Sequence, residues 1–140
     1  MSQAVASATR VRPSSTARVQ PRSRVVYTVL SAAFAGGLIV QVFAAGLGVF
    51  VGDFSLHRLV PIILGVVLIG MLVTARPAHL PKPMGRDTLA LLGLFIVQGL
   101  LADVRGIVPA VSAFHPVNAL LLVAVAFSLA RRAIAATNED

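Results

Sequence analysis

A long uncharged stretch, from Val25 to Val51, most constrains how this chain can fold. It exceeds the roughly 20 residues that a helix needs to cross the hydrocarbon core of a membrane. Hydrophobic residues make up 57% of the sequence and charged residues only 12%, whereas soluble domains carry about 25% charged residues. The composition therefore indicates an integral membrane protein.

Three further apolar stretches follow, separated by short segments that contain glycine, proline or charged residues. Short connections make consecutive helices antiparallel neighbours. We therefore predict an all-α membrane protein, a four-transmembrane-helix up-down-up-down bundle. The expected helices cover about 25–51, 57–75, 88–102 and 109–130.

The basic residues are distributed unevenly along the chain. Of the 12 lysines and arginines, five lie in residues 1–24, three between the second and third stretches and two after the fourth. This positive-inside pattern orients a membrane protein. It predicts a multi-pass protein of the bacterial inner (cell) membrane with both termini in the cytoplasm. The net charge of +7 is then expected to act on the lipid bilayer and not on nucleic acid.

Residues 1–24 are rich in Ser, Ala, Arg and Pro and lack acidic residues, which predicts a disordered basic cytoplasmic tail. Two roles for this tail remain open: an orientation signal beside anionic lipids and an organelle transit peptide. Residues 133–140 are expected to form a polar C-terminal tail. The absence of cysteine excludes disulfides, thiolate metal sites, iron–sulfur clusters and covalently attached haem.

Two histidines mark the candidate site. His57 opens the second apolar stretch and His115 opens the fourth, and ionisable residues at such positions are functional-site candidates. Gln41 precedes His57 by 16 residues and Gln98 precedes His115 by 17. The chain therefore reads as two similar halves, and matched polar residues in repeats point to a site at the repeat interface.

The expected geometry suits a haem. The second and fourth helices run in the same direction and lie diagonally across a bundle of this order. With a rise of about 1.5 Å per residue, the two imidazoles differ in depth by only about 4–5 Å. Two facing imidazoles without a neighbouring carboxylate suit axial ligation of one haem b iron by His57 and His115. The alternative is that each histidine is an interfacial residue hydrogen-bonded to lipid or to a loop.

Other polar residues have secondary roles in this interpretation. Gln41 and Gln98 belong to the cofactor site as interhelical hydrogen-bond donors. Arg58 and Arg105 either bind haem propionates or balance nearby surface aspartates. Two histidines are too few ligands for zinc. His79 lies in a proline-rich loop and is expected to be solvated.

The segment VQGLLADVRGIVPAVSAFHPVNALLLVAVAF (97–127) resembles one half of a heme A synthase. The pair His57-Arg58 is similar to the His-Arg step that opens the second helix of that family, and His115 to its counterpart on the fourth. The resemblance covers about residues 30–130 and implies a four-helix bundle that holds haem b. Phe54 stands where the catalytic half has a glutamate, so hydroxylation is not implied. The chain also resembles small uncharacterised four-helix membrane proteins of high-GC bacteria.

Two functions are consistent with this sequence. One is a b-type cytochrome-like protein for electron transfer or haem handling, with a membrane redox partner. The other is a cofactor-free accessory or structural subunit of a larger membrane complex. Eight glycines in the apolar stretches suit close helix packing or make room for a flat ligand. No nucleophile, paired carboxylate or phosphate-binding loop indicates an enzyme, and the lack of an intramembrane carboxylate disfavours a transporter.

Overall fold

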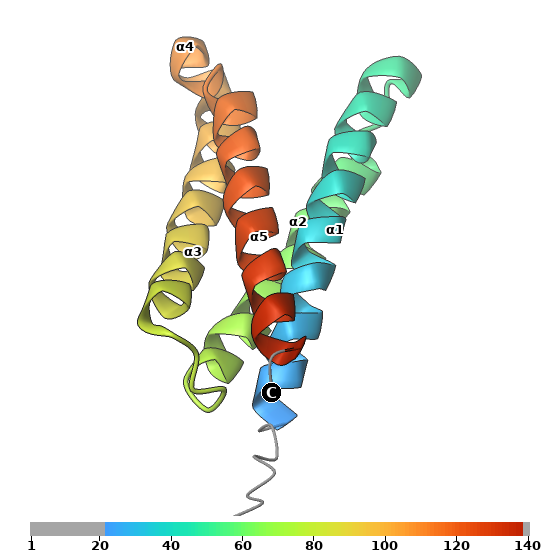
Figure 1. The fold of residues 1–140 in the computed structure, drawn as a ribbon. Coiled ribbons are helices and arrows are strands. Elements are labelled where there is room, and N and C mark those ends of the chain that lie inside the picture. Colours follow the sequence, from blue (N-terminus) through green and yellow to red (C-terminus); the bar gives the residue numbers. More distant parts are fainter. Residues whose placement is uncertain (1–21, 139–140) are drawn as a thin grey trace, which may run out of the picture.

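The computed structural model describes residues 22–138, and this part of the chain is helical and contains no strand. Four helical segments within it are long and apolar enough to cross a membrane, which confirms the predicted all-α class and the number of spanning helices. The elements are α1 (Arg22–Val51), α2 (Ser55–Ala75), α3 (Lys82–Asp103), the short η1 (Val104–Gly106) and α4 (Pro109–Ser112), and α5 (His115–Asn138) (Figure 1).

The helix ends differ from those expected. Helix α1 begins at Arg22, inside the predicted tail, while residues 1–21 of that tail lie outside the described residues. Helix α3 begins at Lys82 rather than near residue 88, because Pro83 occupies the first turn, where a missing backbone N–H breaks no helical bond. Helix α5 continues to Asn138 through an alanine-rich segment, in which Ala133 is buried.

The predicted fourth helix is interrupted. Helix α4 ends at Ser112, and α5 begins at His115 after a turn. Pro116 has no N–H to donate to the carbonyl of Ser112, so a continuous helix would lose a hydrogen bond at this point. The interruption makes His115 the first residue of α5.

The long helices form two antiparallel pairs. Helix α1 packs on α2 through contacts such as Gly37 with Leu64 and Leu30 with Gly70. Helix α3 packs on α5, where Gln98 meets His115 and Asp87 meets Arg132. In Figure 1 the two pairs lie together at the end where α1 begins and α5 ends, and they diverge toward the end that carries α4.

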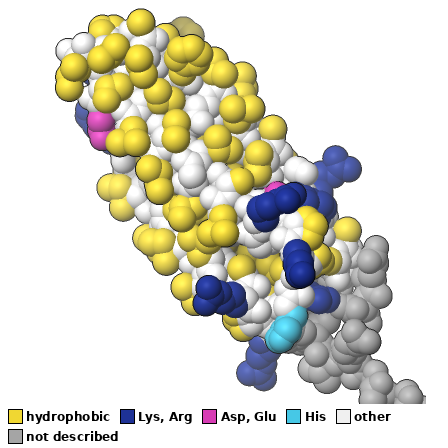
Figure 2. Space-filling view, turned by 90° about the vertical axis from the view of Figure 1, so that its left-hand side faces the viewer, with side chains coloured by type: hydrophobic (Ala, Val, Ile, Leu, Met, Phe, Trp, Pro, Cys, Tyr) yellow, Lys and Arg dark blue, Asp and Glu magenta, His cyan; other side chains and the backbone are white. Residues whose placement is uncertain are grey.

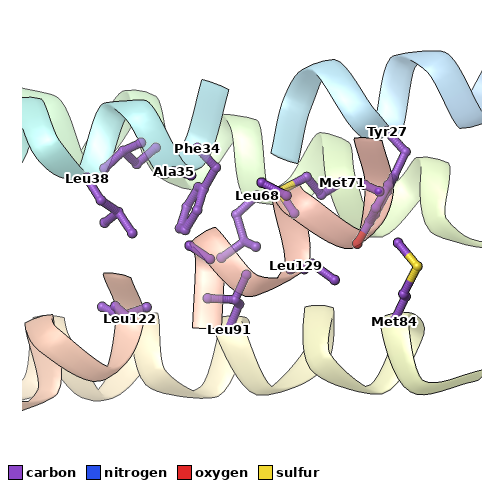
Figure 3. Packing of buried hydrophobic residues seen from close by; sticks show 14 of the residues in the cluster. Tyr27, Phe34, Ala35, Leu38, Leu68, Met71, Met84, Leu91, Leu122 and Leu129 are labelled. Carbon is purple, nitrogen blue, oxygen red and sulfur yellow. The ribbon is translucent and has the colours of Figure 1, made fainter. Parts of the chain in front are cut away.

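The hydrophobic core is concentrated at the end where the pairs meet. Large side chains from all four long helices point toward one another there (Figure 3). Those that are almost completely buried include Tyr27, Phe34, Leu68, Met71, Leu91 and Leu129. These residues lie in the halves of their helices nearest the end where the pairs meet, which we call the closed end, so the largest buried side chains hold the pairs together on that side.

Polar contacts reinforce the closed end. Thr88 Oγ1 donates to the Met84 carbonyl at 2.8 Å, so the hydroxyl of Tyr27 is the donor in its 2.6 Å bond to Thr88 Oγ1. This bond joins α1 to α3 in a buried position. Arg132 and Asp87 form an ion pair of 2.6 Å between α5 and α3. The opposite end, which has no comparable set of buried side chains in the described residues, is left free to enclose a cavity.

Candidate functional site

A cavity of about 320 Å³ lies between the two helix pairs. His57, His115, Gln41 and Gln98 all line it, so the structure brings together the four residues selected from the sequence. A second hollow of about 640 Å³ also borders both histidines and extends toward the α4 end. Small-molecule and cofactor sites commonly have volumes of about 300–1,000 Å³, so this space suits a compact organic ligand.

The two imidazoles lie close to each other. Their ring centroids are 6.4 Å apart, with 64° between the ring planes, and both side chains are half-buried. Two imidazoles that share one metal ion, each with a metal–nitrogen bond of about 2 Å, have ring centres roughly 6 Å apart. The ring separation is therefore of that size, while His115 Nε2 itself faces the Gln98 amide at 3.0 Å.

A chain of hydrogen bonds defines the tautomer of His115. Asn118 Nδ2 donates to the Leu94 carbonyl at 2.9 Å and to Gln98 Oε1 at 2.6 Å. The Gln98 amide therefore turns its Nε2 donor to His115 Nε2, at 3.0 Å. His115 Nδ1 lies 3.1 Å from the Gln98 carbonyl, which only accepts. The proton is thus on Nδ1, and Nε2 carries the lone pair that a metal needs.

His57 has a related arrangement. Its Nδ1 lies 3.3 Å from the Gln41 carbonyl, the counterpart of the bond made by His115. Gln41 Nε2 donates to the His57 carbonyl at 2.9 Å. At 3.0 Å the same amide is closer to Nδ1 than the Gln41 carbonyl is, so these contacts do not assign the proton of His57 as they do that of His115. The His57 carbonyl is available because Pro61, four residues later, has no N–H to donate to it. The glutamine side chain therefore replaces the backbone bond that Pro61 removes.

The cavity has an approximate twofold internal symmetry. Its lining residues on α1 and α2 correspond to residues on α3 and α5 at constant offsets along the chain, 57 residues for the first helix of each pair and 58 for the second. A planar ligand held at both faces by equivalent groups matches such symmetry. The corresponding residues are Leu38 and Phe95, Gln41 and Gln98, Val42 and Gly99, His57 and His115, Pro61 and Ala119, and Leu64 and Leu122.

The structure separates the two roles considered for the glycines. A Cβ atom at Gly37 would lie 2.6 Å from Leu64, and one at Gly48 would lie 2.5 Å from Phe54, so these two glycines permit close packing of α1 on α2 and on its N-terminal turn. Gly99 borders the inner cavity and Gly46 the outer hollow. A Cβ at either would meet no atom within 4 Å, so these two leave room for a ligand.

The basic residues at this end are available to a ligand. Arg58 borders both the cavity and the outer hollow, and Arg105 borders the hollow. Neither forms a salt bridge with Asp53 or Asp103 among the described residues. Two hydrogen bonds from Ser55 lower the pKa of the Asp53 carboxyl, and the charge of Arg58 lowers it further.

Asn118 was not selected from the sequence, although it is central to the site. It stands in VNALLLVAVAF, an otherwise apolar run, and it is only 7% exposed. An isolated amide in such a run requires an internal partner, and this signal could have identified it. Its counterpart in the first half is Val60, and the side-chain oxygen of Gln41 is accordingly buried without a hydrogen-bond partner among the described residues.

The donor set favours an organic cofactor over a bare ion. Within residues 22–138 no group of three or more His, Cys, Asp or Glu side chains could hold a metal. The cavity offers an organic ligand two imidazoles, an apolar wall and the open space beside Gly99.

Comparison with known proteins gives one match. Residues 41–105 are similar to a family described as "Family of unknown function (DUF6220)". This region includes Gln41, His57 and Gln98 but ends before His115. A search of curated proteins and a search of solved structures each gave no match.

Proposed function

We propose that this chain is an integral membrane protein that binds one haem b, with His57 and His115 as the axial ligands. The observation that carries the proposal is the matched placement of the two rings. Each Nδ1 lies within 3.3 Å of the backbone carbonyl of the glutamine on the preceding long helix, and the ring centroids are 6.4 Å apart. At His115, the carbonyl that accepts the Nδ1 proton orients the ring and leaves Nε2 for the metal. At His57 the same role would require Nδ1 to donate to the Gln41 carbonyl instead of accepting from the Gln41 amide.

The cavity residues would bind and orient the cofactor in distinct ways. Leu38, Leu64 and Leu122 supply an apolar floor, and the space beside Gly99 admits a flat ring. Arg58 and Arg105 supply positive charge at the wide end, where propionate groups would meet water and basic side chains. Arg58 and Arg105 would therefore hold the acidic edge of the cofactor toward the α4 end.

Two protein ligands favour electron transfer. An iron atom with both axial positions filled takes up and releases single electrons and has no vacant position for oxygen. The residues of this chain would then hold the iron in a fixed geometry and exclude bulk water from its faces. We infer a role in electron transfer or haem handling together with a membrane redox partner.

The proposal also includes an orientation of the four helices in the membrane. The helices would cross the membrane up, down, up and down, and the end that carries the histidines would lie near the outer leaflet. Most of the described basic residues lie at the other end, which the positive-inside rule assigns to the cytoplasm of a bacterial cell. The resemblance to half of a heme A synthase supports the same cofactor, without the glutamate that would imply its hydroxylation chemistry.

A second candidate is a cofactor-free subunit of a larger membrane complex. One contact favours it: Gln98 Nε2 already donates to His115 Nε2 at 3.0 Å, so the nitrogen needed for the iron has a protein partner. Under the haem proposal the Gln98 amide must move aside when the cofactor binds. Under the alternative it remains in place, and the polar network only joins the helices.

Visible spectroscopy separates the two candidates. The protein is purified in detergent from haem-supplemented cells, and spectra are recorded before and after reduction with dithionite. We expect one haem per chain with low-spin Soret and α bands, lost in His57→Ala and in His115→Ala. His79→Ala is the matched control, because His79 lies in the loop at the opposite end, and it should retain the spectrum.

A colourless but folded wild-type protein would overturn the haem proposal and favour the cofactor-free subunit. Full retention of the low-spin spectrum in either His57→Ala or His115→Ala would overturn the assigned ligands. Circular dichroism of each variant establishes that the helices are intact.

A further inference from the structure

A second, separate groove lies at the opposite end of the molecule. It has a volume of about 680 Å³ and is formed by the C-terminal turn of α2, the 76–81 loop and the first turns of α3. Its apolar wall includes Leu72, Val73 and Leu89. Val73 is 68% exposed and Leu89 61% exposed, so this wall faces the surroundings of the bundle.

Three basic residues border the same groove, namely Arg76, His79 and Lys82, and no acidic residue does. The side chains of Arg76 and Lys82 have no hydrogen bond or salt bridge to the described residues. The nearby carboxylate of Asp87 is already paired with Arg132 at 2.6 Å. Among the described residues, the groove therefore presents positive charge beside exposed apolar surface without a paired carboxylate. Figure 2 shows several Lys and Arg side chains and a histidine among hydrophobic side chains at this end.

The 76–81 loop that borders the groove contains an unusual backbone conformation. His79 has a positive φ of 50°, a conformation that few residues other than glycine adopt, and its Nδ1 donates to the Pro77 carbonyl at 2.9 Å. On the facing helix, a Cβ at Gly85 would meet no atom within 4 Å. The space beside Gly85 is thus unfilled by the described residues.

We infer that this groove binds one anionic phospholipid, with its phosphate between Arg76 and Lys82 and its acyl chains along Leu72, Val73 and Leu89. The basic residues lie where an apolar helix ends, which is the level of the headgroups for a spanning helix. Charge complementarity selects an anionic occupant. The N-terminal segment 1–21 carries arginines and no acidic residue, so its charge has the same sign as the groove and it is not the occupant.

Lipid binding is tested with the full chain in detergent by native mass spectrometry. Phosphatidylglycerol is titrated against phosphatidylcholine, with soluble glycerol 3-phosphate as a competitor. We expect one tightly bound phosphatidylglycerol and roughly thirtyfold weaker binding in the double variant Arg76→Gln/Lys82→Gln, since each basic residue near anionic lipid contributes about a factor of five. Gly85→Leu, which fills the groove without removing charge, should also weaken binding at least fivefold.

Arg86→Gln is the matched control, because Arg86 is an exposed basic residue of α3 that does not border the groove. It should change the affinity less than twofold. An equal loss in Arg86→Gln would overturn the proposal, because diffuse charge would then explain the binding. Equal affinity for phosphatidylcholine, or full competition by glycerol 3-phosphate, would also overturn a site for the intact anionic lipid. The groove and its test do not depend on haem binding.

Discussion

The side-chain amide of Asn118 lies 2.6 Å from Gln98 Oε1, and this contact determines which nitrogen of His115 carries the proton. Asn118 is oriented in turn by the Leu94 carbonyl at 2.9 Å. A residue that touches neither the cavity centre nor the other histidine therefore positions a candidate ligand.

Replacing Asn118 with leucine should destabilise the protein by about 1–3 kcal/mol, because Gln98 Oε1 would lose its donor in a buried position. Chemical or thermal unfolding in detergent measures this change. Haem retention should also fall roughly tenfold, since residues that orient a ligand support metal affinity. Unchanged stability together with unchanged retention would show that the Asn118 network has no positioning role.

The reciprocal change, Val60→Asn, should supply the missing donor in the first half. Val60 is three residues after His57, as Asn118 is three after His115, and the Gln41 Oε1 atom is buried without a described partner. We expect a gain of about 0.6 kcal/mol, the mean for hydrogen bonds between membrane helices. Val60→Asp, which has the same shape but cannot donate when ionised, should destabilise instead. Destabilisation of similar size in both variants would contradict the expected hydrogen bond.

Gly99→Leu should leave the helices folded and abolish haem binding, because the added side chain would enter the cavity without meeting an atom at its Cβ position. Gly36→Leu is the control, since its Cβ also meets no atom within 4 Å and it does not border the cavity. Haem content per chain after purification is the measurement. Equal haem content in both variants would exclude the cavity as the binding site.

Gly37→Ala should be less stable than Gly36→Ala by about 1 kcal/mol, because its Cβ would lie 2.6 Å from the Cδ2 methyl of Leu64 and force that side chain toward the cavity that it borders. The neighbouring Gly36→Ala should be neutral or stabilising by up to about 1 kcal/mol, through the higher helix propensity of alanine. Unfolding curves of the two variants in one detergent provide the comparison. The expected order would be contradicted if Gly36→Ala were the less stable protein.

The turn between α1 and α2 should respond to acid. The backbone N–H of Ser55 donates to Asp53 at 2.9 Å and the Ser55 hydroxyl donates at 2.7 Å. These two hydrogen bonds lower the pKa of the Asp53 carboxyl from its ordinary value. A carboxyl with a depressed pKa stabilises the folded state above its ordinary pKa, and this contribution is lost as the pH falls through the folded-state pKa. Ser55→Ala should move the pKa of Asp53 upward, as carboxyl NMR titration would record. A downward shift would contradict this account of the turn.

Much of the architecture follows from the order of residues alone. Apolar stretches of spanning length must form helices in a membrane, because the backbone has to satisfy its own hydrogen bonds there. The spacing from Gln41 to His57 and from Gln98 to His115 brings each pair together, since a short turn between antiparallel helices places such residues at the same height. Hydropathy located the helix ends less well, because α3 and α5 continue past their apolar stretches.

Only the tertiary structure decided which residues pack between helices and which line the cavity. Gly37 and Gly99 both lie in apolar stretches of sequence, yet Gly37 packs against Leu64 and Gly99 borders a cavity. The difference arises because packing depends on which helix lies opposite. Hydropathy describes each helix separately, whereas the cavity arises from the divergence of two pairs held together at one end. Asn118 likewise acts through atoms of another helix, and so does the His57 carbonyl that Pro61 leaves without a backbone donor. Only the folded chain defines where those atoms lie.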